Sequence, residues 1–354
     1  MGVFREADGD AIRPDLWSKQ LFAEAEKRTF WHRFEGPEGS QMPIIRVDDL
    51  EKEVGDNVHI DIVLALTGEG LTGDTDQGLL DGNEEKLKFR QTSLTTDALR
   101  HGVRWSKLGK IKINHKMRTT GLNQLRKWLA GRLDDKIFAE LTGTGEQTPV
   151  LPLSYIKYVG GDGSAIEAEV GSSDVIDFDV ITDLKALAVN DNEIEPLVNG
   201  PDGEELYGLV VHPYVASAMK KSSEWKEAQR LARERGASNP IFTGAVGVYD
   251  NVVIYQSRRI PRTNTGDSSY VAHNVFFGAQ ALMRAYTYYP DWTEQYFSYG
   301  EEQGIGTFTV VGEKLVTFDL TENGGAAANA KSAIGAMKVV SAAPAPSEVA
   351  SPVA

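Results

Sequence analysis

The sequence of 354 residues contains no cysteine, which excludes a disulfide framework, a thiolate metal site and thiol redox chemistry. It also lacks any run of about 20 apolar residues, the length that a membrane-spanning helix requires. Residues 1–20 contain no apolar segment of the kind found in secretion signals. These absences predict a soluble protein that suits a reducing cytoplasm and has no membrane partner.

Positive charge is scarce, because 37 lysines and arginines stand against 51 aspartates and glutamates, for a formal net charge of -14. A general nucleic-acid binder needs a net basic face, so any contact with DNA must be local. The apolar fraction of 41% is that of an ordinary folded protein. Since the chain is longer than one hydrophobic core usually organises, we expect two compact regions with extensions.

Sequence motifs for catalysis are missing as well. The six histidines are dispersed, and none forms an H-E-x-x-H motif or a close pair suited to zinc. Neither a Walker loop nor a G-x-S-x-G elbow occurs. We therefore predict that the chain is not an enzyme and has no catalytic residue, no cofactor and no metal ion.

One glycine motif offers an alternative. Gly68–Gly73 matches the dinucleotide fingerprint G-x-G-x-x-G and follows a predicted strand. A phosphate-binding loop leads into a helix whose N-terminus faces the anion, but here carboxylates and more glycines follow, and they would repel a pyrophosphate. Those carboxylates could bind Ca²⁺, although their spacing fits no EF-hand. A nucleotide-binding enzyme that uses Gly68–Gly73 is the alternative to a glycine-tipped hairpin.

Alternating apolar residues predict a strand over 58–64, and a second alternating run covers 86–90. The segment between them is rich in glycine and carboxylates, which predicts an extended hairpin. Because an isolated two-stranded ribbon is only marginally stable in water, this hairpin must lie against its own subunit or against another one.

Apolar residues at helical spacing predict that the longest helix covers 118–141 and ends at Gly143. The other predicted elements are an amphipathic N-terminal arm over 15–34, a helix over 178–189 capped by Asp177 or Asp179, a buried strand over 206–211, a helix over 215–235 closed by Gly236, a strand over 252–256, and two β-like runs over 306–318 around Gly312. This mixed order predicts an α+β fold.

The last part of the sequence has a different composition. Residues 322–354 contain eleven alanines, three prolines and no aromatic residue. Such a segment buries too little surface to offset the entropy lost on ordering. We predict that the folded region ends near Leu320 and that residues 322–354 form a flexible Ala/Pro-rich tail.

Acidic and basic residues are segregated along the chain. Residues 53–85 contain nine acidic residues and no lysine or arginine, whereas residues 98–133 contain ten basic residues and no acidic one. Both blocks could be solvated faces of one subunit, or the basic block could face DNA as a sequence-independent phosphate surface. The third hypothesis is an intersubunit interface that fixes the register of an assembly. It pairs Asp74, Asp76, Asp81, Glu84 and Glu85 on the hairpin with Arg100, Arg104, Lys107 and Lys110 on a neighbouring subunit.

Several short motifs are informative because of their order. They are Trp17, Asp49-Leu50 followed by Gly55-Asp56, Leu66–Asp74, Gly82–Glu85, Leu129-Ala130 with Asp134 and Ile137-Phe138, Phe277–Leu282, and Trp292–Glu294 leading to Tyr299-Gly300. In this order, over about residues 15–320, the sequence resembles the N4-like family of major capsid proteins of tailed double-stranded-DNA phages, which share the HK97-type fold.

The resemblance implies an HK97-type α+β subunit. Its parts would be an N-terminal arm over 1–57, an extended loop over 58–106, a peripheral domain over 107–175 and 286–321 that contains the long helix, and an axial domain over 176–285. The predicted hairpin would then be the extended loop, which this resemblance places across a neighbouring subunit. Some shells of this fold carry lysine–asparagine isopeptide bonds, but no matching set of residues can be identified here, so we predict no crosslinking.

The function that the resemblance implies is self-assembly, as hexamers and pentamers, into the icosahedral shell that encloses the phage genome. The expected location is the virion capsid, after synthesis in the cytoplasm of the bacterial host. Portal, scaffold and decoration proteins are further expected partners, and packaged double-stranded DNA would be contacted without sequence specificity. An encapsulin-like compartment for a cargo enzyme, which shares the fold, is the alternative.

Overall fold

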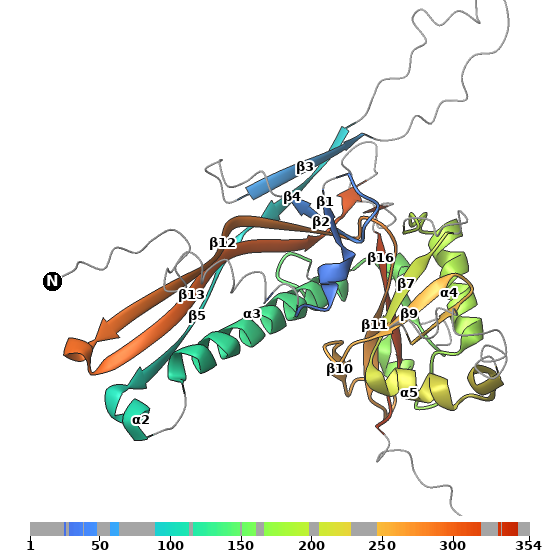
Figure 1. The fold of residues 1–354 in the computed structure, drawn as a ribbon. Coiled ribbons are helices and arrows are strands. Elements are labelled where there is room, and N and C mark those ends of the chain that lie inside the picture. Colours follow the sequence, from blue (N-terminus) through green and yellow to red (C-terminus); the bar gives the residue numbers. More distant parts are fainter. Residues whose placement is uncertain are drawn as a thin grey trace, which may run out of the picture.

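The computed structural model describes residues 25, 28–37, 39–47, 57–63, 89–112, 116–148, 151–160, 166–197, 205–227, 246–319, 332–333 and 335–345. The chain forms two lobes, an elongated lobe built on long strands and a compact lobe at one end of it (Figure 1).

A long antiparallel pair of strands forms the axis of the elongated lobe. β12 (Leu282–Phe297) and β13 (Glu302–Leu315) are joined by the short turn η7 (Ser298–Gly300). The two β-like runs predicted around Gly312 are parts of one strand, because β13 passes through that glycine without a break. A Cβ at Gly312 would lie 2.5 Å from the carbonyl oxygen of Thr95. The glycine is therefore required by the close approach of two chain segments and not by a turn.

The other strands of the elongated lobe complete a five-stranded sheet in the order β1-β2-β12-β13-β5. β5 (Asp97–Ser106) pairs antiparallel with β13 and forms one edge of the sheet. β2 (Ile44–Val47) and β1 (Glu35–Pro37) extend the sheet in parallel on the other side. The sheet narrows outward into a long ribbon, and the short helix α2 (Lys107–Lys112) follows β5 at its outer end (Figure 1).

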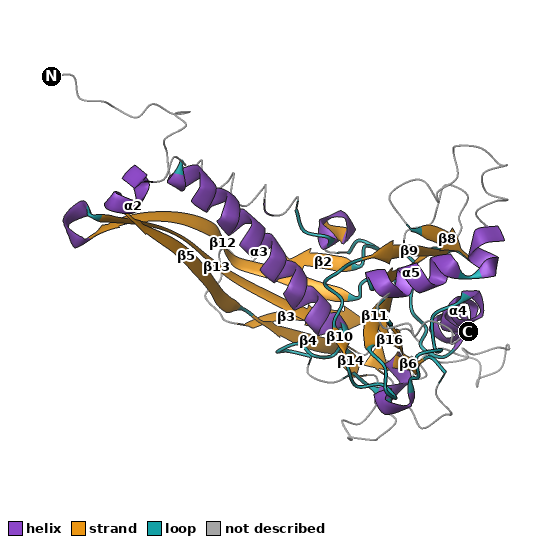
Figure 2. Cartoon of the chain, turned by 90° about the horizontal axis from the view of Figure 1, so that it is seen from below, coloured by secondary structure: helices purple, strands orange, loops and turns teal. Residues whose placement is uncertain are grey.

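One long helix, α3 (Met117–Leu141), lies along a face of this sheet (Figure 2). It confirms the predicted helix, and Gly143 follows it at φ +69°, a conformation that favours glycine. Four of its buried leucines share a cluster with Tyr286, Trp292 and Ile305 of the sheet, and burying one leucine contributes roughly 1.5–3 kcal/mol. These leucines are Leu122, Leu125, Leu129 and Leu133.

The compact lobe contains a seven-stranded sheet in the order β6-β16-β11-β7-β9-β8, with β10 paired to β11. The strands are β6 (Ile156–Tyr158), β7 (Tyr207–Val211), β8 (Gly247–Tyr249), β9 (Val252–Gln256), β10 (Arg262–Thr263), β11 (Val271–Phe277) and β16 (Ala336–Ala342). The helices α4 (Phe178–Asn190) and α5 (Pro213–Lys221) and the turns η4 (Leu153–Tyr155) and η5 (Glu167–Glu169) surround it.

Most predicted elements of the compact lobe are confirmed. β7 and β9 match the predicted strands, and α4 is capped by Asp177, whose Oδ1 accepts a hydrogen bond of 2.9 Å from the amide of Val180. The predicted helix over 215–235 is interrupted at Ser222, because α5 ends at Lys221, and residues 228–235 lie outside the described part of the chain. The Oγ of Ser222 accepts a hydrogen bond from the amide of Trp225, so the serine caps the helical residues that begin at 223.

The predicted flexible tail is wrong for a central part of its length. β16 pairs with β11 along seven residues and with β6 on its other side, and all seven of its own residues are buried. Composition misleads here because the small alanines suit a crowded strand in the middle of a sheet, where Val339 and Val340 supply the apolar area. Two residues of the same segment form β15 (Ser332–Ala333), which pairs with β14 (Phe318–Asp319).

The first strand of the predicted hairpin and its antiparallel pairing are confirmed, but the second strand covers Phe89–Thr95 instead of the predicted run over 86–90. β3 (Asn57–Val63) pairs antiparallel with β4 (Phe89–Thr95) over seven residues. Its tip, with Gly68–Gly73, lies outside the described residues, as does most of the predicted arm over 15–34. The last part of that arm forms the turn η1 (Trp31–Phe34), and its aromatic rings are buried in the core of the compact lobe.

The implied division into an arm, an extended loop, a peripheral domain and an axial domain stays a prediction, and two strands can be placed in the lobes as follows. β5, expected within the extended loop, belongs to the sheet of the elongated lobe, and β6, expected in the peripheral domain, belongs to the sheet of the compact lobe.

Candidate intersubunit surface

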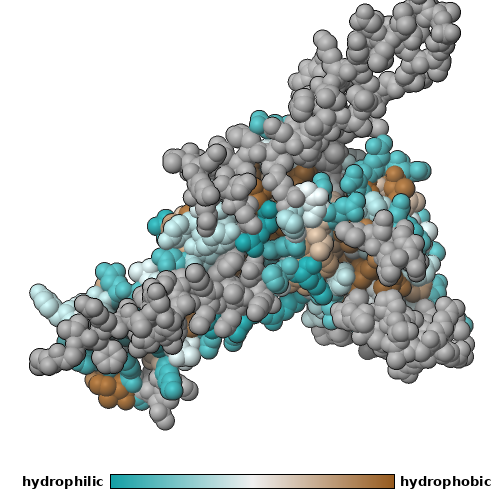
Figure 3. Space-filling view, turned by 45° about the horizontal axis from the view of Figure 1, so that its top comes forward, coloured by the Kyte–Doolittle hydropathy of each residue, from teal (hydrophilic) through white to brown (hydrophobic). Residues whose placement is uncertain are grey.

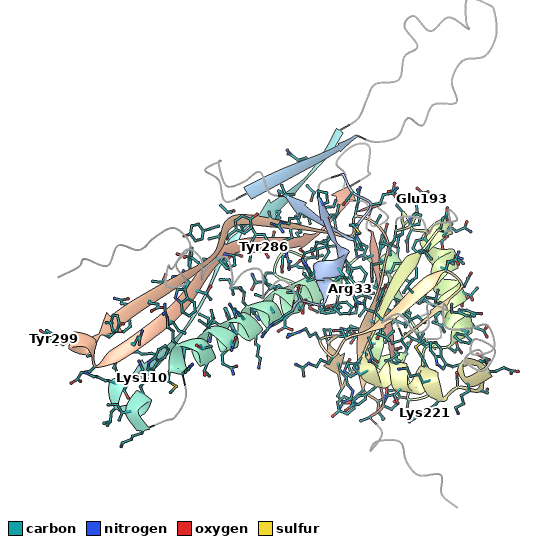
Figure 4. All side chains as sticks on the ribbon, in the orientation of Figure 1. Arg33, Lys110, Glu193, Lys221, Tyr286 and Tyr299 are labelled. Atoms are coloured by element: carbon teal, nitrogen blue, oxygen red, sulfur yellow. The ribbon has the colours of Figure 1, made fainter. Side chains whose placement is uncertain are left out.

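The outer end of the ribbon exposes apolar side chains. We call this surface, formed by α2 and the residues 296–302 around η7, the ribbon tip. Tyr299 is fully exposed, and the side chains of Leu108, Ile111 and Tyr296 are 63%, 75% and 66% exposed. Figure 3 shows a hydrophobic patch at this end of the molecule, and Tyr299 and Lys110 lie near each other there (Figure 4). Clustered apolar exposure of this kind marks an interaction surface.

Local backbone chemistry holds the ribbon tip together. Ser298 and Tyr299 have φ values of 51° and 54°, which are uncommon for residues other than glycine and reverse the chain sharply between β12 and β13. The amide of Lys107 donates a hydrogen bond of 2.6 Å to the carbonyl of Glu301, so α2 is tied to the turn. None of the residues of α2 is buried. The helix therefore has no core of its own subunit to stabilise it.

The four predicted basic interface residues lie together on the outer half of the ribbon. Arg100 and Arg104 are on β5, and Lys107 and Lys110 are on α2. Arg104 forms an ion pair with Glu302 of its own subunit, and its Cζ lies 4.3 Å from the centroid of the Phe297 ring. One of the four charges is therefore already paired.

The five predicted acidic partners, Asp74, Asp76, Asp81, Glu84 and Glu85, lie outside the described residues. Their pairing with the basic residues stays a prediction. The sequence reasoning also missed the apolar residues of the ribbon tip. A signal was present, because Leu108 and Ile111 lie three residues apart within a segment that is otherwise basic and polar.

Buried charges hold the inner part of the elongated lobe together. Arg284 of β12 is fully buried, and its Nη2 lies 2.6 Å from Oε1 of Glu313 on β13. Its Nη1 pairs with Glu35 of β1. Burial opposes the charge of Arg284, but Tyr286, Glu313 and Glu35 outweigh burial and raise its pKa. Burial raises the pKa of Glu313, and the nearby Arg284 reduces this effect without cancelling it.

A second charged cluster lies in the compact lobe. Glu167 of η5 lies 2.9 Å from Nε2 of His273 on β11 and 3.2 Å from Nζ of Lys338 on β16. Burial, together with Lys338, lowers the pKa of His273 to about 4 against the opposing effect of Glu167. The imidazole is therefore neutral at pH 7, and the cluster connects β16 to its partner strand and to η5.

Neither cluster has the composition of a metal centre. Within the described part of the chain, no three histidine, aspartate or glutamate side chains are grouped so that they could hold a metal ion. In the same part of the chain, no helix is long and apolar enough to cross a membrane.

The overall fold is that of phage shell proteins. A solved capsid of Ralstonia phage GP4 superposes with a TM-score of 0.73 at 24% identity, covering 98% of this chain and 99% of the other. The capsid asymmetric unit of cyanophage Pam1 gives a TM-score of 0.73 at 18% identity, covering 97% and 96%. These similarities confirm the predicted α+β fold of the HK97 type.

The sequence places the chain within one family. The family model described as phage capsid protein matches residues 5–345, and the chain belongs to that family. A curated relative, the major capsid protein of Pseudomonas phage KPP25, is 27% identical over 334 residues, which cover 84% of this chain and 87% of the relative.

Proposed function

We propose that this chain is a major capsid protein that self-assembles into the icosahedral shell around the double-stranded DNA genome of a tailed phage. The observation that carries the proposal is the family match, which spans residues 5–345 and so includes both lobes and β16. The relative from phage KPP25, itself described as a major capsid protein, supports the same role.

The exposed apolar side chains of the ribbon tip also support the proposal. A soluble subunit that leaves several large apolar residues exposed on a projecting surface gains free energy when another surface covers them. β5 is an edge strand, and an edge strand offers unpaired backbone groups to another chain. We assign the ribbon tip to contacts between copies of this chain, and repeated contacts of one kind close into rings and shells.

The proposal includes the finer expectations of the resemblance. These are membership of the N4-like group, capsomers of six and five copies, location in the virion capsid and synthesis in the bacterial cytoplasm. Portal, scaffold and decoration proteins are proposed partners, and packaged DNA is a proposed non-specific contact. The chain has a structural role in this proposal, and none of its residues is assigned to catalysis.

Electron microscopy of the purified full-length chain tests the proposal directly. We expect capsomers or closed particles with tens to hundreds of copies, because heterologous contacts that close a ring also permit a closed shell. The mass of the particles should be measured in parallel across protein and salt concentrations. A strictly monomeric species under all of these conditions would contradict the proposal.

A further inference from the structure

The hairpin of β3 and β4 joins the rest of the subunit through a short root, the residues 92–96. The two strands form a sheet of their own, apart from the sheets of the two lobes (Figure 1), and β4 packs against β13 and β14. A single residue, Thr96, separates β4 from β5, which pairs with β13 from Asp97 onward. The hairpin therefore leaves the elongated lobe at the point where β5 joins the five-stranded sheet.

Packing against the lobe holds one face of the root. Thr92 and Leu94 are 5% and 0% exposed. The buried Thr96 accepts a hydrogen bond of 3.1 Å from Oγ1 of Thr287 on β12. A Cβ at Gly312 of β13 would lie 3.2 Å from the side chain of Leu94. The root is therefore in close contact with the sheet of the elongated lobe.

Two side chains of the lobe bind the backbone of the root. Oε1 of Gln147 accepts a hydrogen bond of 2.9 Å from the amide of Thr95, and Nε2 of the same glutamine donates one of 2.6 Å to the Thr95 carbonyl. Nζ of Lys314 on β13 donates a hydrogen bond of 2.6 Å to the carbonyl of Ser93. Backbone groups of alternate residues point to the same edge of a strand, so the two side chains bind one edge of β4 as a neighbouring strand would.

The C-terminal end of α3 places both of these side chains. Glu140 is 4% exposed, and its Oε1 accepts a hydrogen bond of 3.1 Å from the backbone amide of Gln147. Burial lowers the pKa of Lys314, and the charge of Glu140 opposes this shift. The carboxylate of Glu140 therefore connects the long helix to both groups that bind the edge of β4.

We propose that Gln147 and Lys314 are positioning residues that fix the direction in which the hairpin leaves the subunit. Packing of Leu94 restrains a tilt of the hairpin away from the lobe, and the two side chains at its edge restrain a swing in the plane of its sheet. The strand from Thr95 to Phe89 is about 20 Å long, so a swing of about 20° at the root would displace its far end by about 7 Å.

The inference rests on the proposed function where it concerns assembly. Copies that hold the hairpin at one angle can repeat one contact throughout a shell, whereas copies with different angles cannot.

Distances between two spin labels in the dilute, unassembled subunit test the inference. The chain has no cysteine, so Gln91→Cys on β4 and Lys127→Cys on α3, both at exposed positions, can be labelled selectively. Gln147→Met combined with Lys314→Met removes the hydrogen bonds to the edge of β4 and keeps side chains of similar length. The width of the distance distribution should increase about twofold, and an unchanged width would overturn the inference.

Two further variants control for other effects of the substitutions. Glu146→Gln changes an exposed neighbour in the same loop and should keep the wild-type width. Gln147→Met alone leaves Lys314 beside Glu140, and it should widen the distribution by a smaller amount while the subunit melts within about 2–4 °C of wild type. This single variant decides the test if the double variant does not fold. Equal widths for Gln147→Met and Glu146→Gln would then overturn the inference.

Electron microscopy of the same variants separates this inference from the proposed function. Gln147→Met should give particles with a wider range of diameters than wild type or Glu146→Gln. Uniform particles from a variant whose distance distribution has widened would show that the root does not set a contact in the shell, which would overturn the inference for assembly. Absence of particles from the wild-type chain would count against the proposed function, and the spin-label distances would still decide whether Gln147 and Lys314 fix the hairpin.

Discussion

The compact lobe and the elongated lobe differ in how completely they bury their own surfaces. In the compact lobe every residue of β11 and β16 is buried. In the elongated lobe neither β5 nor α2 contains a single buried residue, although both belong to regular secondary structure. The compact lobe therefore contains its own stabilising contacts, whereas the outer ribbon leaves residues of its edge strand and of α2 uncovered. Substitutions in the first should change the stability of the subunit, and substitutions in the second should change its assembly.

The largest effect should come from removing β16. A chain that ends at Ala330 lacks a strand that lies between β6 and β11 with all of its residues buried, so we expect the soluble folded subunit to be lost. Solubility and circular dichroism during heating check this. A chain that ends at Ala345 keeps all of β16 and is the control. A cooperative melt at the wild-type temperature for the shorter chain would show that the compact lobe does not need this strand.

The buried ion pairs of the elongated lobe should give the next largest effect. Arg284→Met leaves Glu35 and Glu313 buried without their guanidinium, which should lower the free energy of unfolding by about 3–5 kcal/mol. The control is Lys185→Met, which breaks a partly exposed pair of 2.7 Å with Asp250 and should cost at most about 1 kcal/mol. Equilibrium unfolding in urea measures both. Similar losses in the two variants would mean that the buried network is not what holds this part of the sheet.

Lowering the pH should decrease the stability of the compact lobe through protonation of His273. The folded pKa of this histidine is about 4, below its ordinary value of 6.5, so the unfolded chain binds the proton first. The contribution to stability is therefore complete above pH 6.5 and is lost as the pH falls toward 4, by an amount on the order of 2–3 kcal/mol. Urea unfolding between pH 7.5 and 4 should show a shallower loss for His273→Asn than for wild type. The control His32→Asn, at an exposed position, should retain the wild-type slope.

Substitutions at the ribbon tip should act almost entirely on assembly. Leu108→Ser combined with Ile111→Ser should change subunit stability by no more than about 0.5 kcal/mol, because neither side chain is buried. The concentration required for particle formation, followed by light scattering, should nevertheless rise. Leu153→Ser removes an exposed leucine of the compact lobe and should leave assembly unchanged. If the tip variant assembles like wild type, the ribbon tip is not a contact surface.

Substitutions in the acidic block over 53–85 and the basic block over 98–133 should have the smallest effect per residue, since one exposed ion pair contributes only about 0–1 kcal/mol. Replacing Asp74, Asp76, Asp81, Glu84 and Glu85 by lysine should impair assembly at low salt but not at 1 M salt, where the screening length is about 3 Å. Changing Arg100, Lys107 and Lys110 to glutamate in the same chain should partly restore it, and Arg104 is left because Glu302 already pairs with it. If only the basic reversal has an effect, and that effect is on genome packaging, the basic block faces DNA.

The elements that the sequence predicts best are those determined by residues that lie close together in the chain. The leucines of α3 and the Asp177 cap of α4 act within a few residues of each other, so periodicity and capping rules locate both helices. β16 carries no such local signal, because its burial depends on β11 and β6, which are remote in the sequence. The same holds for Arg284, whose partners Glu35 and Glu313 are 249 and 29 positions away. For Leu108 and Ile111 the sequence signal is their isolation within a basic and polar segment, but that they are exposed is shown by the tertiary structure.

The place of β16 in the sequence has a consequence for synthesis. The ribosome makes β11 first and then residues 278–335 before it reaches this strand, which at roughly 5–20 residues per second takes about 3–12 s. During that interval one long side of β11 has no partner, and the nascent chain exposes a strand edge that is prone to aggregation. A chain released early can never complete the sheet. The sheet of the compact lobe is therefore completed only after β16 has been synthesised.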